Sequence, residues 1–201
     1  MSLKKLKILG VIMAFLLCFP LHFLYDKIPS FITSIVSPVN ESIWEHMKIL
    51  FGSILLSGVI QKIIVKVKHL YYKNLSISNV IASISSIPIF LIFYLPIYSL
   101  IGEKILITIL LMLITIIISQ LITISIINMK KNLKLENVSI LFIIVIYLIL
   151  TYLTYNPLKY ELFKDSINNM YGIKKELVLN YFKSLTTLFK NPFFAILFST
   201  K

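Results

Sequence analysis

The stretch that decides the fold is Ile105–Ile127, ILITILLMLITIIISQLITISII, because it contains no acidic or basic side chain. A helix needs about 20 predominantly apolar residues to cross the hydrocarbon core of a bilayer, and this stretch is long enough. Residues 77–101 and 138–155 are also free of acidic and basic side chains, and residues 8–25 form a further apolar run. The sequence therefore predicts several transmembrane helices.

The composition agrees with this interpretation. Of the 201 residues, 58% are hydrophobic and only 14% are charged, with a mean hydropathy of +0.92. The first apolar run follows three lysines, as the core of a signal peptide does, but no small-x-small cleavage pattern follows it, so we expect a retained helix. Cys18, the one cysteine, has no partner for an intramolecular disulfide, and we expect a small buried side chain there.

The second helix is an exception among the predicted spans. Between Lys48 and Gln61 only residues 49–60 are uninterrupted by a charged or amide side chain, which leaves this run about eight residues short of a full span. We expect Lys62 and Lys66 to extend their charged ends toward one interface. The charged residues that precede position 49 would then lie in the opposite interface or in a cavity lined by protein.

Lysine supplies all 20 basic side chains, and its distribution predicts the orientation, since positive charge favours cytoplasmic loops. Lysines gather at alternate connections, namely Lys4, Lys5 and Lys7; Lys62, Lys66, Lys68 and Lys73; and Lys130, Lys131 and Lys134. We predict an all-α, polytopic transmembrane helical bundle of about five spans with its N-terminus inside. The lysines that give the net charge of +12 lie mostly between the apolar runs and form no basic groove. We therefore expect the lipid bilayer and no nucleic acid as a partner.

The residues after position 173 are predicted to form a separate segment. Within residues 174–201, leucine and aromatic residues recur at helical spacing, and lysines occupy the other side. This pattern is typical of a basic amphipathic helix that lies on a membrane surface. The chain is therefore divided into a transmembrane domain, residues 1–173, and an amphipathic interfacial tail, residues 174–201.

Polar side chains are concentrated in one segment, residues 38–48, with the sequence PVNESIWEHMK. Ionisable residues at the edge of a membrane are candidates for function, because placing them there is costly. Trp44, the only tryptophan, is typical of the aromatic belt at a membrane interface, although it could also form a platform for a substrate. Function is therefore sought first in this segment.

The local sequence of this segment predicts where the second helix begins. Pro38 cannot continue a preceding helix and Asn40 is a favoured cap, so we expect the helix to begin near Asn40 with Glu41 in its first turn. Glu41, Glu45 and Lys48 would then share one face of the helix at spacings of four and three residues.

A metal site is one interpretation of the polar residues at this end of the bundle. His22 and Asp26 lie one helical turn apart at the end of the first run, on the side to which the next connection returns the chain. His22, Asp26 and His46 are candidate ligands, because imidazole and carboxylate groups bind divalent metals such as zinc, manganese or iron. Glu41 and Glu45 are candidate catalytic carboxylates, one of which could act as base to a metal-bound water.

The same residues also have a purely structural interpretation. His22 could bond to Asp26 as an interfacial pair, in which case neither residue has a chemical role. Glu45 and His46 could form a buried network with Lys48 that stabilises one packing of the helices.

Three blocks of sequence stand out, and they are residues 22–26 (HFLYD), residues 37–48 (SPVNESIWEHMK), and residues 162–165 (LFKD) with 171–173 (YGI). They resemble blocks of a family of bacterial multi-pass membrane proteins known only as a domain of unknown function, over about residues 10–173. The resemblance implies a bacterial cytoplasmic membrane and adds Asp165 and Tyr171 to the candidate site. Their alternative role is a folded loop that caps the bundle. Ser166 stands where the family tends to have proline, and the tail extends beyond the family's usual end.

Two classes of function fit these observations. The first is a small membrane module for binding, transport or assembly, whose extracytoplasmic polar site recognises a cation, a lipid ligand or a membrane-protein partner. The second is a metal-dependent intramembrane hydrolase of a lipid or lipid-linked substrate, with a divalent metal such as zinc as cofactor. The module is favoured, because five spans without an internal repeat fit a subunit.

Overall fold

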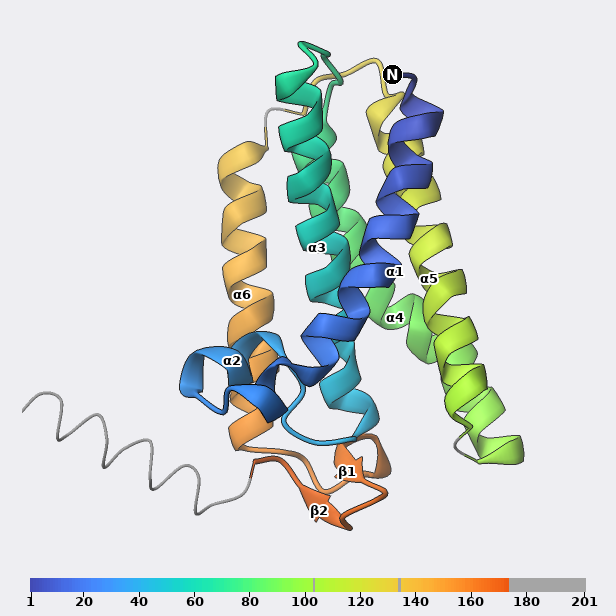
Figure 1. The fold of residues 1–201 in the computed structure, drawn as a ribbon, viewed down its shortest axis with the longest axis vertical. Helices are drawn as coiled ribbons and strands as arrows, with labels where there is room; N and C mark the ends of the chain where they lie inside the picture. Colours follow the sequence, from blue (N-terminus) through green and yellow to red (C-terminus); the bar gives the residue numbers. More distant parts are fainter. Residues whose placement is uncertain (103, 134, 174–201) are drawn as a thin grey trace, which may run out of the picture.

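The computed structural model describes residues 1–102, 104–133 and 135–173. The helices are α1 (Leu3–Lys27), α2 (Phe31–Val36), α3 (Ile43–Val67), α4 (Leu75–Ile101), α5 (Ile105–Ile127) and α6 (Glu136–Tyr155) (Figure 1). A short 3-10 turn, η1 (Glu161–Phe163), leads into an antiparallel hairpin of β1 (Lys164–Asp165) and β2 (Met170–Tyr171). The predicted all-α class is confirmed, and the predicted amphipathic tail lies outside the described residues.

Among the described residues, five helices are long and apolar enough to cross a membrane, as the sequence predicts. These candidate spans are Leu3–Lys27, Ile43–Val67, Leu75–Ile101, Ile105–Ile127 and Val138–Tyr155. Their length and composition are those of a multi-pass membrane protein.

The second helix extends well beyond its uninterrupted apolar run. That run covers residues 49–60, and the charged residues before it were expected in an interface or in a cavity lined by protein; α3 is a continuous helix of 25 residues with Lys48 inside it. Lys48 does not interrupt the span, because its side chain is fully buried and is paired with Glu45. Charge enclosed by protein in this way does not face lipid.

The start of α3 also differs from the prediction. The helix begins at Ile43 and not near Asn40, because Ser42 is its N-cap and the Ser42 hydroxyl oxygen accepts a hydrogen bond from the Glu45 amide at 3.3 Å. Glu41 therefore lies in the connection before the helix and not in its first turn. Its position is set by that connection.

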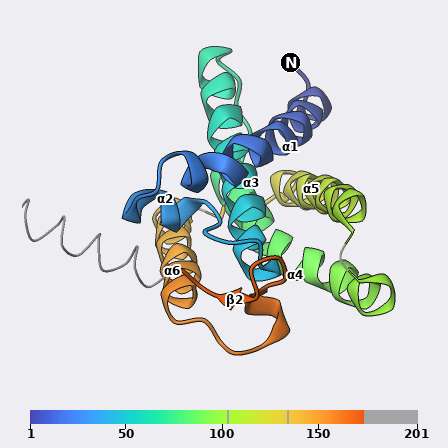
Figure 2. The ribbon, with the colours of Figure 1, turned by 60° about the horizontal axis from the view of Figure 1, so that its bottom comes forward.

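The connection between the first two spans contains a helix that was not predicted, α2. Ser30 and Thr33 form a capping box at its start: the Thr33 amide donates to the Ser30 hydroxyl at 3.1 Å, and the Ser30 amide donates to the Thr33 hydroxyl at 3.0 Å. At its end, the Ser37 hydroxyl donates to the carbonyl of Leu21 at 2.6 Å. These bonds fasten α2 to the end of α1, and Figure 2 shows α2 beside α6.

Helix α3 forms the centre of the bundle. In its most apolar window 61% of residues are buried, compared with 28% for α1 and 17% for α6, so α3 lies inside and the other two face outward. It contacts α1, α4, α5 and α6 (Figures 1 and 2). The buried hydrophobic side chains of α3 are Met47, Ile49, Leu50, Phe51 and Ile54. The outward apolar faces of the other helices suit a lipid surrounding.

The two ends of the bundle differ in chemistry. One end holds the N-terminus and the α3–α4 and α5–α6 connections, which carry Lys4, Lys68, Lys73 and Lys130; we call it the lysine-rich end. The other holds α2, the start of α3 and the hairpin, and we call it the site end (Figure 1). Among the described residues, lysines from each of the three clusters used to predict the orientation thus lie at this one end.

Candidate functional site

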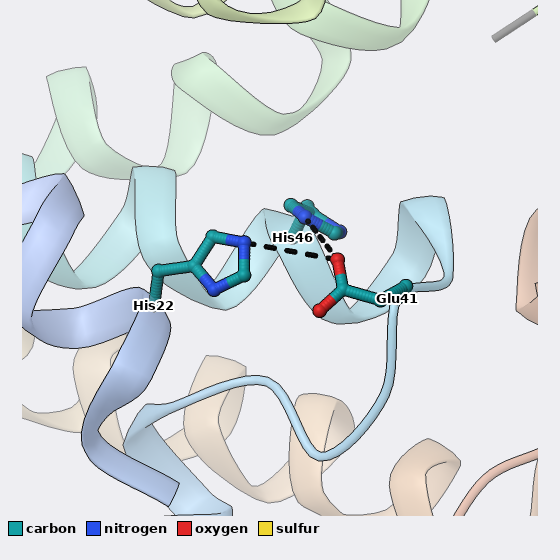
Figure 3. Close-up of side chains that lie close together, drawn as sticks. All are labelled: His22, Glu41 and His46. Carbon is teal, nitrogen blue, oxygen red and sulfur yellow. Dashed lines mark ion pairs between the residues drawn. The ribbon is translucent and has the colours of Figure 1, made fainter. Parts of the chain in front are cut away.

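Three side chains that can bind a metal converge at the site end. His22 comes from α1, His46 from the first turns of α3, and Glu41 from the connection that precedes α3 (Figure 3). One ligand atom of each residue lies within 4.8 Å of the other two. Oε2 of Glu41 is 3.7 Å from Nε2 of His22 and 3.4 Å from Nε2 of His46. We call these three residues the His–Glu cluster.

The two imidazoles are oriented differently. Nδ1 of His46 lies 2.8 Å from the carbonyl oxygen of Ser42, so Nδ1–H donates to that oxygen and Nε2 is the ring nitrogen nearer Glu41. The His22 ring meets the His46 ring edge to face, with ring centroids 5.2 Å apart. The side chains of His22 and Glu41 are 29% and 34% exposed and that of His46 is 14% exposed, so an ion can reach them.

The hairpin holds the connection that carries Glu41. The amide of Glu41 donates to Oδ2 of Asp165 at 3.3 Å. Asn40 donates through Nδ2 to the carbonyl of Gly172 at 2.9 Å, and its Oδ1 accepts from the amide of Ser42 at 2.9 Å. Asn40 thus links the connection before α3 to the residue after the hairpin, which is distant in the sequence, and does not cap the helix.

Asp165 is a structural anion in this arrangement. Its side chain is buried, and besides Glu41 it accepts hydrogen bonds from the amides of Ile167 and Asn168 and from Nδ2 of Asn168. Burial acts to raise the pKa of Asp165, but the hydrogen bonds from Asn168, Glu41 and Ile167 outweigh it and lower that pKa below its ordinary value. The alternative role foreseen for Asp165, in a folded loop that caps the bundle, fits these contacts.

Glu45 and Lys48 turn away from the His–Glu cluster and form a buried ion pair. Nζ of Lys48 donates to Oε2 of Glu45 at 2.7 Å and to the carbonyl of Ser34 in α2 at 2.7 Å. The other carboxylate oxygen of Glu45 accepts from the hydroxyl of Thr154 in α6 at 2.7 Å, and Oε2 also accepts from the amide of Val39. This pair therefore joins α3 to α2 and α6. The structural interpretation placed Glu45 and His46 in one network with Lys48; the structure pairs Glu45 with Lys48, whereas His46 lies beside Glu41.

Three other candidate residues lie outside the cluster. Asp26 is exposed, and His22 pairs with Glu41 instead of Asp26. The Trp44 ring packs on Phe163 of η1 with centroids 4.8 Å apart, so it contributes to the contact between α3 and the loop that follows α6. Tyr171 lies in β2 and is 36% exposed.

Two cavities border the His–Glu cluster. One, of about 270 Å³, lies between α1, α3 and α5 and is lined by the three cluster residues and by apolar side chains that include Phe15, Phe19 and Met112. The other, of about 150 Å³, is lined by Glu41, Tyr98, Glu161 and Lys164 among others. Glu41 borders both cavities and therefore lies between an apolar space and a polar one.

The comparisons with known proteins assign the chain to a family. A family model described as "Family of unknown function (DUF6512)" matches residues 1–173. The chain belongs to the DUF6512 family. The DUF6512 match includes every residue of the His–Glu cluster and of the network that holds it. No curated protein and no solved structure matches the chain.

Several residues that hold the DUF6512 site in place were missed from the sequence, and they are Ser34, Ser42, Thr154 and Gly172. Ser42 could have been found, because Ser42 and Glu45 form the S-x-x-E spacing that marks a helix start. Thr154 is a hydroxyl at the end of a long apolar run, which is a weak signal. Gly172 takes a positive φ of 63°, a conformation that favours glycine but is not visible in the sequence.

Proposed function

We propose that this DUF6512 protein is a small membrane module that binds one divalent transition-metal ion through His22, Glu41 and His46 at its extracytoplasmic end. The observation that carries the proposal is the convergence of two imidazole nitrogens and a carboxylate oxygen, from three separate segments, within 4.8 Å. Relative to the sequence prediction, Glu41 takes the place of Asp26 as the carboxylate ligand.

The donor set favours zinc among the common metals. A tetrahedral zinc ion with bonds of about 2.0–2.1 Å separates its ligand atoms by about 3.3 Å. Glu41 Oε2 lies 3.4 Å and 3.7 Å from the Nε2 atoms of the two histidines, and all three ligand atoms lie within 4.8 Å of one another, so the site is completed when the two imidazoles close on the ion. The bond from His46 Nδ1 to the Ser42 carbonyl supports the same role, because metal-bound histidines donate their second nitrogen in this way.

The surroundings of the cluster favour an amphipathic ligand. Three protein ligands leave a fourth position on a tetrahedral ion open. The apolar cavity beside the cluster suits an acyl chain, and the polar cavity on the other side of Glu41 suits a headgroup. The module would then bind a lipid-like molecule whose polar group reaches the metal.

The alternative, a metal-dependent hydrolase of a lipid substrate, needs a carboxylate that is free to act as base. Glu41 is a ligand in the present proposal. Glu45 is bonded to Lys48, Val39 and Thr154, and both of its oxygens face away from the cluster. The open coordination position is compatible with catalysis. Binding, however, requires only the three ligands, whereas hydrolysis also requires a carboxylate that is free to act as base.

Titration of the purified, chelator-treated protein with zinc tests the proposal. We expect about one site per chain in the wild type, with affinity reduced at least tenfold in His22→Ala, His46→Ala and Glu41→Gln. His69→Asn is the matched control, because His69 is the third histidine, is exposed, and has a positive φ of 49° that asparagine tolerates. Equal zinc affinity in all of these proteins would overturn the proposal.

A further inference from the structure

A second buried polar cluster lies at the lysine-rich end, more than ten helical positions from the His–Glu cluster along α1. Lys7 of α1 is only 3% exposed, and its Nζ donates to Oε1 of Gln61 at 2.7 Å and to Oδ1 of Asn79 at 3.2 Å. Both partners are neutral, and within the described ranges no carboxylate lies at ion-pair distance from Lys7. A buried ammonium without an anion is costly, so this cluster calls for a negatively charged partner.

The packing of the helices brings the polar groups of this second cluster together. A methyl group at position 10 would collide with the side-chain amide of Gln61, so Gly10 is what allows α3 to bring that amide against α1. Oε1 of Gln120 in α5 accepts a hydrogen bond from Nε2 of Gln61 at 3.4 Å. Lys7, Gln61 and Gln120 therefore form a chain of polar groups across three helices.

A cavity of about 520 Å³ opens onto this chain between α1 and α5. Lys7 and Gln120 form its polar part, Lys4 adds a second positive charge, and the remaining lining is aliphatic, including Val11, Ile117 and Leu121. Gln120 is 2% exposed, and among the residues that the structure describes its Nε2 donor has no hydrogen-bond partner. The cavity is thus an apolar space bordered by the buried side chains of Lys7 and Gln120, and the Nε2 donor of Gln120 has no partner among the described residues.

We propose that this cavity binds an anionic phospholipid from the leaflet at the lysine-rich end. The phosphate would accept hydrogen bonds from Lys7 and Gln120 and would neutralise the Lys7 ammonium. An acyl chain would lie along the aliphatic wall between α1 and α5, two helices that run side by side in Figures 1 and 2. Free phosphate would satisfy only the polar part, so the combined lining specifies a lipid. This proposal does not depend on the metal site.

Native mass spectrometry of the purified full chain with added phosphatidylglycerol, phosphatidylcholine or inorganic phosphate tests it. We expect phosphatidylglycerol to bind at least tenfold more tightly than phosphatidylcholine, and inorganic phosphate not to compete at equal concentration. Lys7→Met should reduce phosphatidylglycerol binding roughly tenfold or more, which is the loss of about one charge-assisted hydrogen bond. Lys5→Met removes the same charge from an exposed neighbour that does not line the cavity, and it should bind like the wild type.

Two further variants cover the case in which Lys7→Met does not fold. Gln120→Leu removes the unpartnered donor, and Ile117→Trp fills the cavity from a side chain that is 41% exposed while leaving Lys7 in place. Both should weaken phosphatidylglycerol binding. Equal binding of the two lipids by the wild type, displacement of lipid by inorganic phosphate alone, or unchanged binding in Gln120→Leu and Ile117→Trp would each overturn the proposal.

Discussion

Oε2 of Glu41 lies 3.4 Å from Nε2 of His46, although Glu41 precedes the helix that carries His46 and is not on its face. Contacts with residues outside α3 fix this distance between Glu41 and His46. Asp165 binds the Glu41 amide, and Asn40 binds the Gly172 carbonyl. The carboxylate of the His–Glu cluster is therefore positioned by residues near the C-terminal end of the described sequence. Substitutions in the hairpin should consequently affect the cluster.

Gly172→Ala should lower both stability and zinc affinity. Position 172 has a positive φ of 63°, and an added Cβ would lie 2.9 Å from Cγ of Pro157 and would also crowd the Thr154 carbonyl. We expect a loss of about 2 kcal/mol or more, measured by thermal unfolding in detergent. Gly102→Ala is the control, because Gly102 also has a positive φ, of 69°, but has open space around its Cβ. It should lose stability through its backbone alone and keep the zinc affinity of the wild type.

Breaking the buried pair of Glu45 and Lys48 should destabilise the protein strongly. Glu45→Gln or Lys48→Met leaves one buried charge without its partner, which costs about 3–5 kcal/mol, or on the order of 10 °C in the unfolding midpoint. The double variant should recover part of this loss, because it leaves neither charge buried alone. Neutralising Glu161, which pairs with Lys164 at the surface, should change stability by less than about 1 kcal/mol. Equal effects of the two single substitutions and the Glu161 control would contradict the buried network.

Asp165 should make stability depend on pH in the acidic range. Its pKa is lower in the folded protein than in the unfolded chain, so its contribution is complete above the ordinary aspartate pKa of about 4 and is lost as the pH falls through the folded pKa. Asp165→Asn should therefore be less stable than the wild type at pH 7, and the difference should shrink below about pH 4. Asp26→Asn, at an exposed position, should match the wild type within about 0.5 kcal/mol. A difference for Asp165→Asn that is constant down to pH 3 would disprove this role.

The predicted orientation can be measured by labelling single cysteines in intact cells. In a Cys18→Ser background, Lys159→Cys at the site end should react with a membrane-impermeant maleimide, and Lys68→Cys at the lysine-rich end should react only after lysis. Both positions are exposed, so reactivity reports sidedness and not burial. The reverse pattern would place the His–Glu cluster in the cytoplasm.

The five spans were predictable because long apolar runs leave few alternatives in a membrane. The sequence left open whether Lys48 lies in the interface or in a cavity lined by protein, and the structure decides this by enclosing Lys48 with Glu45. The start of α3 was misplaced for a related reason. Asn40 and Ser42 are both good caps, and the contact of Asn40 with Gly172, distant in the sequence, decides between them.

The candidate site was predictable in part. His22 and His46 were expected to meet, because the short connection returns the chain to the same end. Asp26 shares a helical face with His22 but lies about 6 Å further along the axis of α1, and His22 pairs with Glu41 instead. The cavity with Lys7 and Gln120 was not foreseen, because their convergence depends on how α1, α3 and α5 pack.

The central claim, that His22, Glu41 and His46 form one metal site, is tested most directly by X-ray absorption spectroscopy of the protein loaded with one equivalent of zinc. The account predicts scattering from two imidazoles at about 2.0–2.1 Å together with oxygen ligands, and one imidazole in His22→Ala. A spectrum with oxygen ligands only, or one identical in the wild type and His22→Ala, would contradict it.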